Sequence, residues 1–179
     1  MAARVKRLEL AITEVVKLAS PQVQEVVKGL QTLRGIAEIS AVTIVAELGN
    51  IARFDTPRQL MGYSGAVPSE DSSGKRKRQG SITKTGNAHL RRIVIEAAWS
   101  YRHRPAIGAR LRQRQEGVSE PIKEIAWKAQ VRLSRRYARL AAAGKDKPKI
   151  VTAVGRELLG FIWAIGVKAE RTVTQQIAA

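Results

Sequence analysis

One stretch, residues 68–87, combines residue types that could do chemistry on a phosphate. It reads Pro-Ser-Glu-Asp-Ser-Ser-Gly-Lys-Arg-Lys-Arg-Gln-Gly-Ser-Ile-Thr-Lys-Thr-Gly-Asn, so Ser72 and Ser73 directly precede a glycine and four cations, Lys75, Arg76, Lys77 and Arg78. A serine hydroxyl becomes a nucleophile where a base takes its proton or where cations stabilise the charge that develops. The stretch therefore predicts either a serine that attacks a phosphate or a flexible linker whose cations only grip DNA or RNA.

Further cations follow in the helix expected after this stretch, whose N-terminus would point back toward it. Lys84, His89, Arg91 and Arg92 are expected to contact phosphate. For His89 a role as general base is the alternative.

A second candidate contact precedes the serine stretch, at residues 33–41. A helix, a glycine-bearing turn at Gly35 and Ile36, and a second helix match the layout of helix-hairpin-helix DNA binders, in which backbone N–H groups meet a phosphate. Glu38 and Ala37 fit that layout less well, and an ordinary helical hairpin that packs against the core is the alternative.

Charge is unevenly distributed along the 179 residues. Residues 1–74 contain eight Lys/Arg and eight Asp/Glu, whereas residues 75–179 contain 24 and seven, so the whole net charge of +17 lies after residue 74. Such asymmetry indicates a polyanionic partner, most simply nucleic acid. The alternatives are a solubilising surface or binding to a ribosome or a membrane surface.

Several classes of site are excluded because the sequence lacks the residues or motifs that they require. There is no cysteine, hence no disulfide or thiolate metal site, and no cluster of Asp and Glu is arranged like a two-metal nuclease centre. No Walker loop, dinucleotide fingerprint, signal peptide or apolar run of membrane-spanning length is found. Trp99, Trp127 and Trp163 lie on or beside apolar stripes and are expected in the core. We expect no membrane partner, no cofactor, and a cytoplasmic, nucleoid-associated protein.

The periodicity predicts a mainly all-α fold. Helices are expected at residues 1–33 in two segments divided by Ser20-Pro21, then at 41–48, 57–61, from Asn87 or Thr85 to about 104, at 119–143 and at 148–165, with a frayed tail after Gly166. An irregular basic serine loop interrupts them. The expected domains are a helical arm at 1–33, a main domain at 34–145, and a C-terminal helix and tail at 146–179. The arm is half of a coiled coil or a plain packed helix pair.

A set of short pieces resembles the C-terminal transposase domain of the insertion-sequence 110/116/902 family. They span about residues 33–99 in the expected order: Gly35-Ile36, Ala46-Glu47-Leu48-Gly49, Phe54, Arg58-Gln59-Leu60, Tyr63-Ser64-Gly65, Pro68-Ser69, Ser72-Ser73-Gly74, Ile82-Thr83-Lys84-Thr85-Gly86-Asn87, Leu90-Arg91-Arg92 and Glu96-Ala97-Ala98-Trp99.

This resemblance implies DNA transposition by a DEDD-type recombinase. It implies that Ser73, with Ser72 as the alternative, attacks a DNA phosphate and holds the strand covalently. It also implies a coiled-coil arm that makes a homo-oligomer and, in some members, a structured guide RNA. The family's metal-binding carboxylate domain would precede the arm; we expect it to be absent here, and Mg²⁺ to belong only to that domain. A non-catalytic nucleic-acid-binding module and an assembly module are the competing interpretations.

Overall fold

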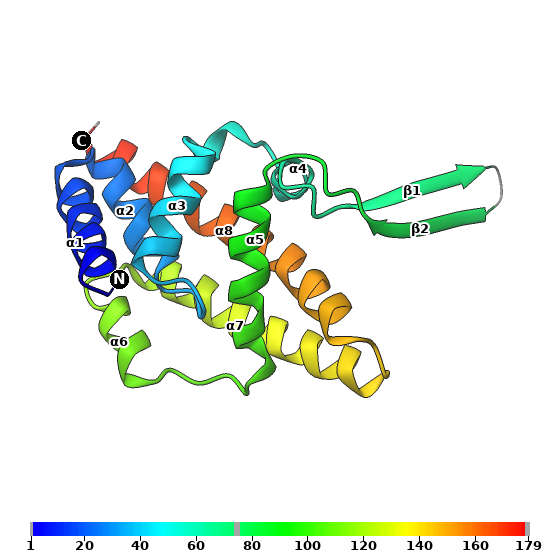
Figure 1. Cartoon of the computed structure of the whole chain (residues 1–179). Helices are drawn as coiled ribbons and strands as arrows, with labels where there is room; N and C mark the ends of the chain where they lie inside the picture. Colours follow the sequence, from blue (N-terminus) through cyan, green and yellow to red (C-terminus); the bar gives the residue numbers. More distant parts are fainter. Residues whose placement is uncertain (1, 74–75, 178–179) are drawn as a thin grey trace.

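The protein folds into a helical body from which one β-hairpin projects (Figure 1). The computed structural model describes residues 2–73 and 76–177, and the side chains of residues 3–69, 80 and 82–177. Within these residues the mainly helical expectation is confirmed. The elements are α1 (Ala2–Leu18), α2 (Pro21–Leu30), α3 (Glu38–Leu48), the 3₁₀ turn η1 (Ile51–Arg53), α4 (Pro57–Tyr63), β1 (Pro68–Ser73), β2 (Arg76–Ile82), α5 (Ala88–Ala98), the 3₁₀ turn η2 (Trp99–Arg102), α6 (Ala109–Gln115), α7 (Glu120–Ala142) and α8 (Lys147–Ile177).

Three of these helices begin at the capping residues that the sequence indicates. Ser20 and Thr56 each precede a proline, and their hydroxyls accept hydrogen bonds from the backbone N–H groups three residues ahead, at 3.4 Å in both cases. Asn87, not Thr85, caps α5, because its side-chain oxygen accepts from the N–H of Leu90 at 2.8 Å. Local sequence is therefore sufficient to place these helix starts.

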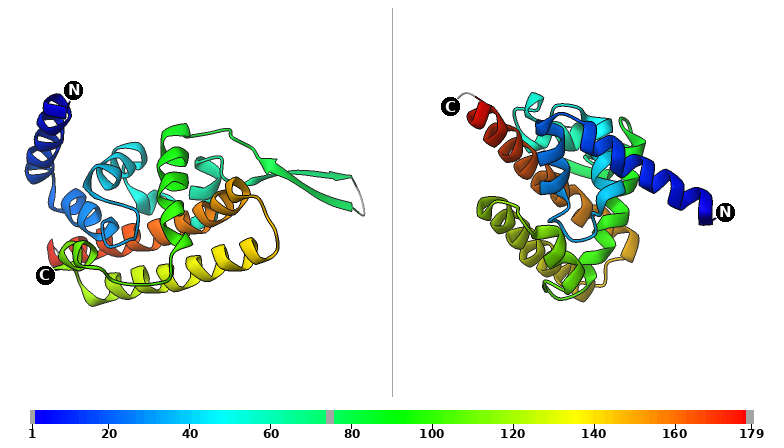
Figure 2. Two further views of the ribbon diagram at one scale, coloured as in Figure 1. Left: turned by 60° about the horizontal axis from the view of Figure 1, so that its bottom comes forward. Right: turned by 90° about the vertical axis from the view of Figure 1, so that its left-hand side faces the viewer.

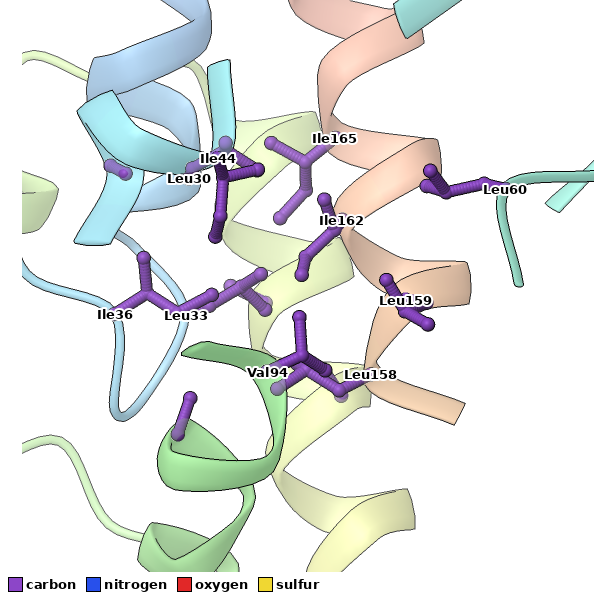
Figure 3. Packing of buried hydrophobic residues seen from close by; sticks show 14 of the residues in the cluster. Leu30, Leu33, Ile36, Ile44, Leu60, Val94, Leu158, Leu159, Ile162 and Ile165 are labelled. Carbon is purple, nitrogen blue, oxygen red and sulfur yellow. The ribbon is translucent and has the colours of Figure 1, made fainter. Parts of the chain in front are cut away.

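Helix α8 is the centre of the fold. It packs against α2, α4, α5, α7 and η1, and Leu158, Leu159, Ile162 and Ile165 meet side chains from several of these elements (Figure 3). The expectation of a helix that ends near Ile165 with a frayed tail is wrong: α8 continues to Ile177. The extension is stable because it buries its own apolar residues, Val167, Ala169 and Val173.

A buried carboxylate ties the end of α8 to the rest of the body. Glu170 is only 4% exposed, and its two oxygens accept hydrogen bonds from the backbone N–H groups of Ile51 and Ala52, each at 2.7 Å. These N–H groups belong to the first turn of η1 and have no partner within that turn. The contact gives the N–H groups at the start of η1 their acceptors, and it gives the buried carboxylate its donors.

Helix α7 lies beside α8, and a tight turn at Gly144 joins the two in opposite directions (Figure 2). Ser119 stands at its N-cap position, as expected. Along its apolar stripe, Ala129 and Leu133 are buried, and Ile125, Tyr137 and Leu140 are partly buried against the core. The inward face of α7 therefore follows its apolar periodicity.

The two helices expected as an arm have different environments. Helix α2 buries Val26, Val27 and Leu30 in the core, whereas α1 leans away from the body in both views of Figure 2. Several apolar residues of α1 remain exposed, with Leu8 54% and Val15 67% accessible, whereas Val16 near its end packs against the core. The predicted segment 1–33 thus divides at Ser20 into a helix that projects and a helix that belongs to the core.

The length and composition of α8 alone would allow it to cross a membrane. The expectation that no segment meets that test is therefore wrong. In the body, 56% of its most apolar window is buried by other parts of the chain. Central packing accounts for the apolar composition of α8, because a helix surrounded by other helices is apolar on more than one face.

Candidate nucleic-acid interface

The serine stretch forms a two-stranded antiparallel hairpin that projects away from the helices (Figure 1). Its register pairs Ser73 with Arg76, Ser72 with Lys77 and Asp71 with Arg78, with a bulge between Pro68 and Glu70. The prediction of an irregular loop is therefore wrong. Serine, aspartate, lysine and glycine have low strand propensity, which hides the hairpin from sequence patterns, whereas opposite charges directly across two strands favour their pairing.

The neck of the hairpin, residues 63–67 and 83–87, is held by backbone hydrogen bonds. The N–H of Thr83 donates to Val67 O at 2.9 Å, that of Lys84 to Gly65 O at 3.2 Å, and that of Asn87 to Tyr63 O at 2.9 Å. These bonds continue past the two strands to the start of α5. They set where the hairpin leaves the body.

Two glycines allow the two sides of the neck to approach this closely. A Cβ atom at Gly65 would lie 1.9 Å from Thr85 O, and one at Gly86 would lie 2.3 Å from Tyr63 O. Both residues also have positive φ, +66° and +102°, which side chains disfavour. The family pieces Tyr63-Ser64-Gly65 and Thr85-Gly86-Asn87 therefore build the neck that positions the serines.

The N-terminus of α5 is anchored beside the neck. The side-chain amide of Asn87 donates to Glu47 Oε2 at 2.6 Å, so the capping residue of α5 is also tied to α3. His89, predicted to contact DNA, is exposed, and its Nδ1 lies 3.4 Å from Glu47 Oε1. Glu47, which the sequence analysis named only within the family piece Ala46-Glu47-Leu48-Gly49, therefore contacts both Asn87 and His89.

The other cations predicted to contact phosphate in this region differ in their exposure and in their partners within the chain. Arg91 is partly buried, and it donates to Ser64 O at 2.8 Å, which makes it part of the neck. Arg92 is exposed and paired with Glu96 at 3.0 Å. Lys84 is exposed in the left-handed region with φ of 58°. The side chains of Lys84, His89 and Arg92 are therefore at the surface, whereas Arg91 holds the backbone of the neck at Ser64.

The turn at Gly35 and Ile36 packs against the body. The Ile36 side chain is fully buried, its N–H donates to Leu33 O at 3.2 Å, and its carbonyl accepts from Arg114. A Cβ atom at Gly35 would lie 2.6 Å from Ala97 O. α3 also begins at Glu38, three residues before the expected start at Ala41. A phosphate contact at this turn would have to use backbone groups, and it stays a prediction.

The predicted nucleophile and its cations fall partly outside the described residues. Lys75 lies outside them altogether. For Ser72, Ser73, Arg76, Lys77 and Arg78 the backbone register is known, and their side chains lie outside the described part. Their predicted roles remain predictions. Among the described residues no group of three or more His, Asp or Glu side chains could hold a metal ion.

A group of residues on α7 was missed by the sequence analysis. Trp127, expected in the core, is 43% exposed, so that expectation is wrong for this residue, whereas Trp99 and Trp163 are partly buried against the core. Trp127 shares its groove with Lys128, Arg132, Arg135, Arg136 and Arg139. The cations recur at positions four, seven, eight and eleven residues after Lys128, a one-sided helical spacing that could have shown this face from the sequence.

Comparisons with known proteins agree with the sequence motifs. Residues 27–112 match the model of the transposase IS116/IS110/IS902 family. The chain is 50% identical over 149 residues to the transposase y4qE of Sinorhizobium fredii, a match that covers 83% of this chain and 38% of that protein. It is 35% identical over 96 residues to a family 20 transposase of Pseudomonas aeruginosa, covering 54% of this chain and 27% of that protein.

A third relative is the transposase for the insertion sequence element IS1111A of Coxiella burnetii, 35% identical over 69 residues, which cover 38% of this chain and 19% of that protein. The chain thus spans less than two fifths of the length of these curated relatives. The matched region, 27–112, holds the core helices α3 and α5, the hairpin and its glycine neck. Through this region, the chain belongs to the IS116/IS110/IS902 transposase family.

Proposed function

We propose that the chain is the DNA-binding and strand-exchange part of an insertion-sequence transposase, in which Ser73 attacks a DNA phosphate. In that step the Ser73 Oγ–phosphorus bond forms, one phosphorus–oxygen bond to a sugar breaks, and the serine proton ends on the departing sugar oxygen. The observation that carries the proposal is the hairpin register, which opposes Ser73 to Arg76 and Ser72 to Lys77. Cations beside the serines would stabilise the charge of the pentacoordinate transition state.

Projection of the hairpin also supports this role. Because the two strands extend from the body, a duplex could reach their far end without meeting the helices (Figure 1). The glycine neck would hold the hairpin at one angle, and fixed geometry is what a nucleophile requires to act on a large substrate.

The test of Ser73 uses the full chain with a nicked duplex that carries an activated phosphate at the junction. A denaturation-resistant protein–DNA band is expected, and it should disappear in Ser73→Ala. Ser81→Ala, the same substitution elsewhere in the hairpin, is the matched control and should keep the band. Loss in Ser72→Ala alone would move the nucleophile to Ser72. No band despite salt-sensitive binding would instead support a non-catalytic DNA-binding module.

The role of the hairpin cations is tested by the salt dependence of duplex binding. The slope of log K against log salt is negative. Its magnitude should fall by up to about 3.6, at about 0.9 per phosphate contact, when Lys75, Arg76, Lys77 and Arg78 are replaced by glutamine. The matched control removes four exposed cations elsewhere, Arg110, Arg112, Lys168 and Arg171. Equal slopes for the two variants would contradict a DNA contact at the hairpin.

We also propose that a second copy of the chain covers α1. Leu8 and Val15 lie seven residues apart with Ile12 between them, which is coiled-coil spacing, and both are more than half exposed. Leu8→Glu with Val15→Glu should convert an oligomer into a monomer in light scattering. Arg7→Glu, on the same helix, should leave the mass unchanged, and a monomeric wild-type chain would refute the pairing. The family resemblance makes a structured RNA a further candidate partner, which the same binding assays can test.

A further inference from the structure

A groove of about 850 Å³ runs along the outer side of α7 where that helix meets α8. It lies on helices that follow the region of the family match, residues 27–112, and it shares none of its lining with the serine hairpin or its neck. Its size is in the range of sites that take substantial ligands. The groove therefore requires its own explanation.

Positive charge dominates this groove. Five of its lining residues, Lys128, Arg132, Arg135, Arg136 and Arg139, are cations, and Glu157 is its one acidic lining residue. They recur along one side of α7, next to the stripe that buries Ala129 and Leu133 in the core. Packing against α8 thus fixes the direction in which all five cations are presented.

Only part of this charge is neutralised within the chain. Glu157 Oε2 lies 2.8 Å from Arg132 Nε, and its Oε1 lies 3.2 Å from Arg136 Nε. Within the described part of the chain neither Arg135 nor Arg139 forms an ion pair. Like charges this close repel one another, and an anion bound in the groove would remove that repulsion.

Arg136 adds a further observation at this groove, in the position of its Nε atom. It is buried and has no hydrogen-bond partner among the described residues, because its contact with Glu157 is close but misaligned. A buried donor without an acceptor is unfavourable. An anionic oxygen in the groove would attract the partly exposed guanidinium of Arg136.

Aromatic side chains accompany the cations. Trp127 is 43% exposed at the groove, and Phe161 of α8 lines it as well. Exposed tryptophan among arginines is the composition with which proteins bind single strands, because bases stack on the ring while cations hold the phosphates. In a duplex the base faces are already stacked on each other and are not available to a side chain.

We propose that this groove binds an unpaired segment of DNA, with bases stacked on Trp127 and phosphates held by Arg135 and Arg139. The cations extend from Lys128 to Arg139, which on a helix is about 16 Å and so matches a few nucleotides. We choose DNA because the chain belongs to a transposase family and because strand exchange would unpair DNA, so this choice rests on the proposed function. The binding does not depend on Ser73 chemistry.

The experiment measures binding of the full chain to a fluorescent oligothymidylate of 20 nucleotides by anisotropy across a series of salt concentrations. Arg135→Gln with Arg139→Gln should reduce the magnitude of the negative slope of log K against log salt by about 1.4, at about 0.7 per single-strand phosphate contact. The matched control, Arg110→Gln with Arg112→Gln, removes two exposed cations from α6 and should leave the slope unchanged.

Trp127 provides a second readout that does not involve charge. Trp127→Ala should weaken oligothymidylate binding about 5- to 150-fold, the effect of losing a stacked base, with the salt slope unchanged. Trp127→Phe should restore most of the affinity because the ring remains. Binding to a 20-base-pair duplex should change little in either variant.

The outcomes separate this proposal from the one about Ser73. The proposal that the groove binds single strands would be overturned if the arginine variant had the same salt slope as its control, or if Trp127→Ala bound oligothymidylate with wild-type affinity. Tighter binding of oligouridylate than of oligothymidylate would overturn the choice of DNA. If the wild-type chain gives no covalent band but binds single strands as expected, only the serine nucleophile is rejected. If it gives the band but its single-strand binding does not depend on these residues, only the groove proposal is rejected.

Discussion

The serine hairpin and the core around α8 are held in place by different physics. Helix α8 is surrounded by four other helices and η1, and its side chains are buried in one continuous apolar cluster (Figure 3). The hairpin contacts the body through its neck, where three backbone hydrogen bonds and two close glycine approaches fix it. One region is stable because it removes apolar surface from water, and the other because two backbones meet in one geometry.

This difference shows why the residue types with chemical potential are in the hairpin. Serines and cations cannot contribute to an apolar core, so a segment that carries them must be positioned without one. The neck achieves this with main-chain contacts, which leave the side chains of the strands available for other roles. Four pairs of substitutions test how far the two regions are independent.

The largest effect is expected in the core. Leu158→Ala removes a fully buried side chain from the centre of α8 and should lower the free energy of unfolding by about 3–4 kcal/mol. Ile82→Ala, at the base of the hairpin where the side chain is only partly buried, should lower it by less than about 1 kcal/mol. Urea denaturation measures both, and equal losses would show that the hairpin shares the stability of the core.

The buried carboxylate of Glu170 should come next. Glu170→Ala removes the acceptor from the buried N–H of Ile51 and from the partly buried N–H of Ala52, and it should lower the free energy of unfolding by about 3 kcal/mol. Glu157→Ala removes a carboxylate whose pairs with Arg132 and Arg136 lie at the surface groove, and it should change stability by less than about 1 kcal/mol. A small loss of stability in both variants would mean that water takes the place of Glu170 as the hydrogen-bond acceptor.

In the neck, Gly65→Ala adds a Cβ atom that would lie 1.9 Å from Thr85 O at a residue with φ of +66°. Opening the neck should relieve this clash, with a local effect of about 2 kcal/mol. Hydrogen exchange of the Thr83, Lys84 and Asn87 amides should then accelerate about thirtyfold, while core amides keep their protection. Gly62→Ala, where no atom lies within 4 Å, is the control and should change none of these rates.

The smallest effects should differ in sign between two tyrosines. Tyr101 is fully buried, its hydroxyl has no hydrogen-bond partner among the described residues, and burial raises the pKa of its phenol. Tyr101→Phe should therefore stabilise the protein by about 1 kcal/mol. Tyr63→Phe loses a hydrogen bond to Glu47 O at 3.2 Å and should destabilise it by about 1 kcal/mol. Thermal unfolding of the pair is the measurement, and a destabilised Tyr101→Phe would reveal a hidden partner.

Local signals were sufficient for most helices but not for the hairpin. Ser20-Pro21, Thr56-Pro57 and Asn87 place helix starts because a cap acts on backbone groups only a few residues away. The hairpin was missed because its stability depends on cross-strand pairing and on a neck between residues some twenty positions apart. The end of α8 was missed because its last turns depend on partners such as Ile51 and Ala52.

Of the candidate site, residue types and family motifs named the serines, and tertiary contacts then distinguished the neighbouring cations. Arg91 turned inward to Ser64, whereas Lys84 and His89 stayed exposed, although all three read alike in the sequence. Trp127 was assigned to the core because it lies beside an apolar stripe, and only the packing of α7 on α8 shows that it faces outward.

Composition and local pattern determine the helical class, the helix starts, the concentration of positive charge after residue 74 and the transposase motifs, because each depends on neighbouring residues alone. Three features depend on the folded chain: the angle of the hairpin, the central place of α8 and the basic groove with Trp127. Each needs contacts between residues far apart in sequence, whose geometry is set only when the apolar faces pack together.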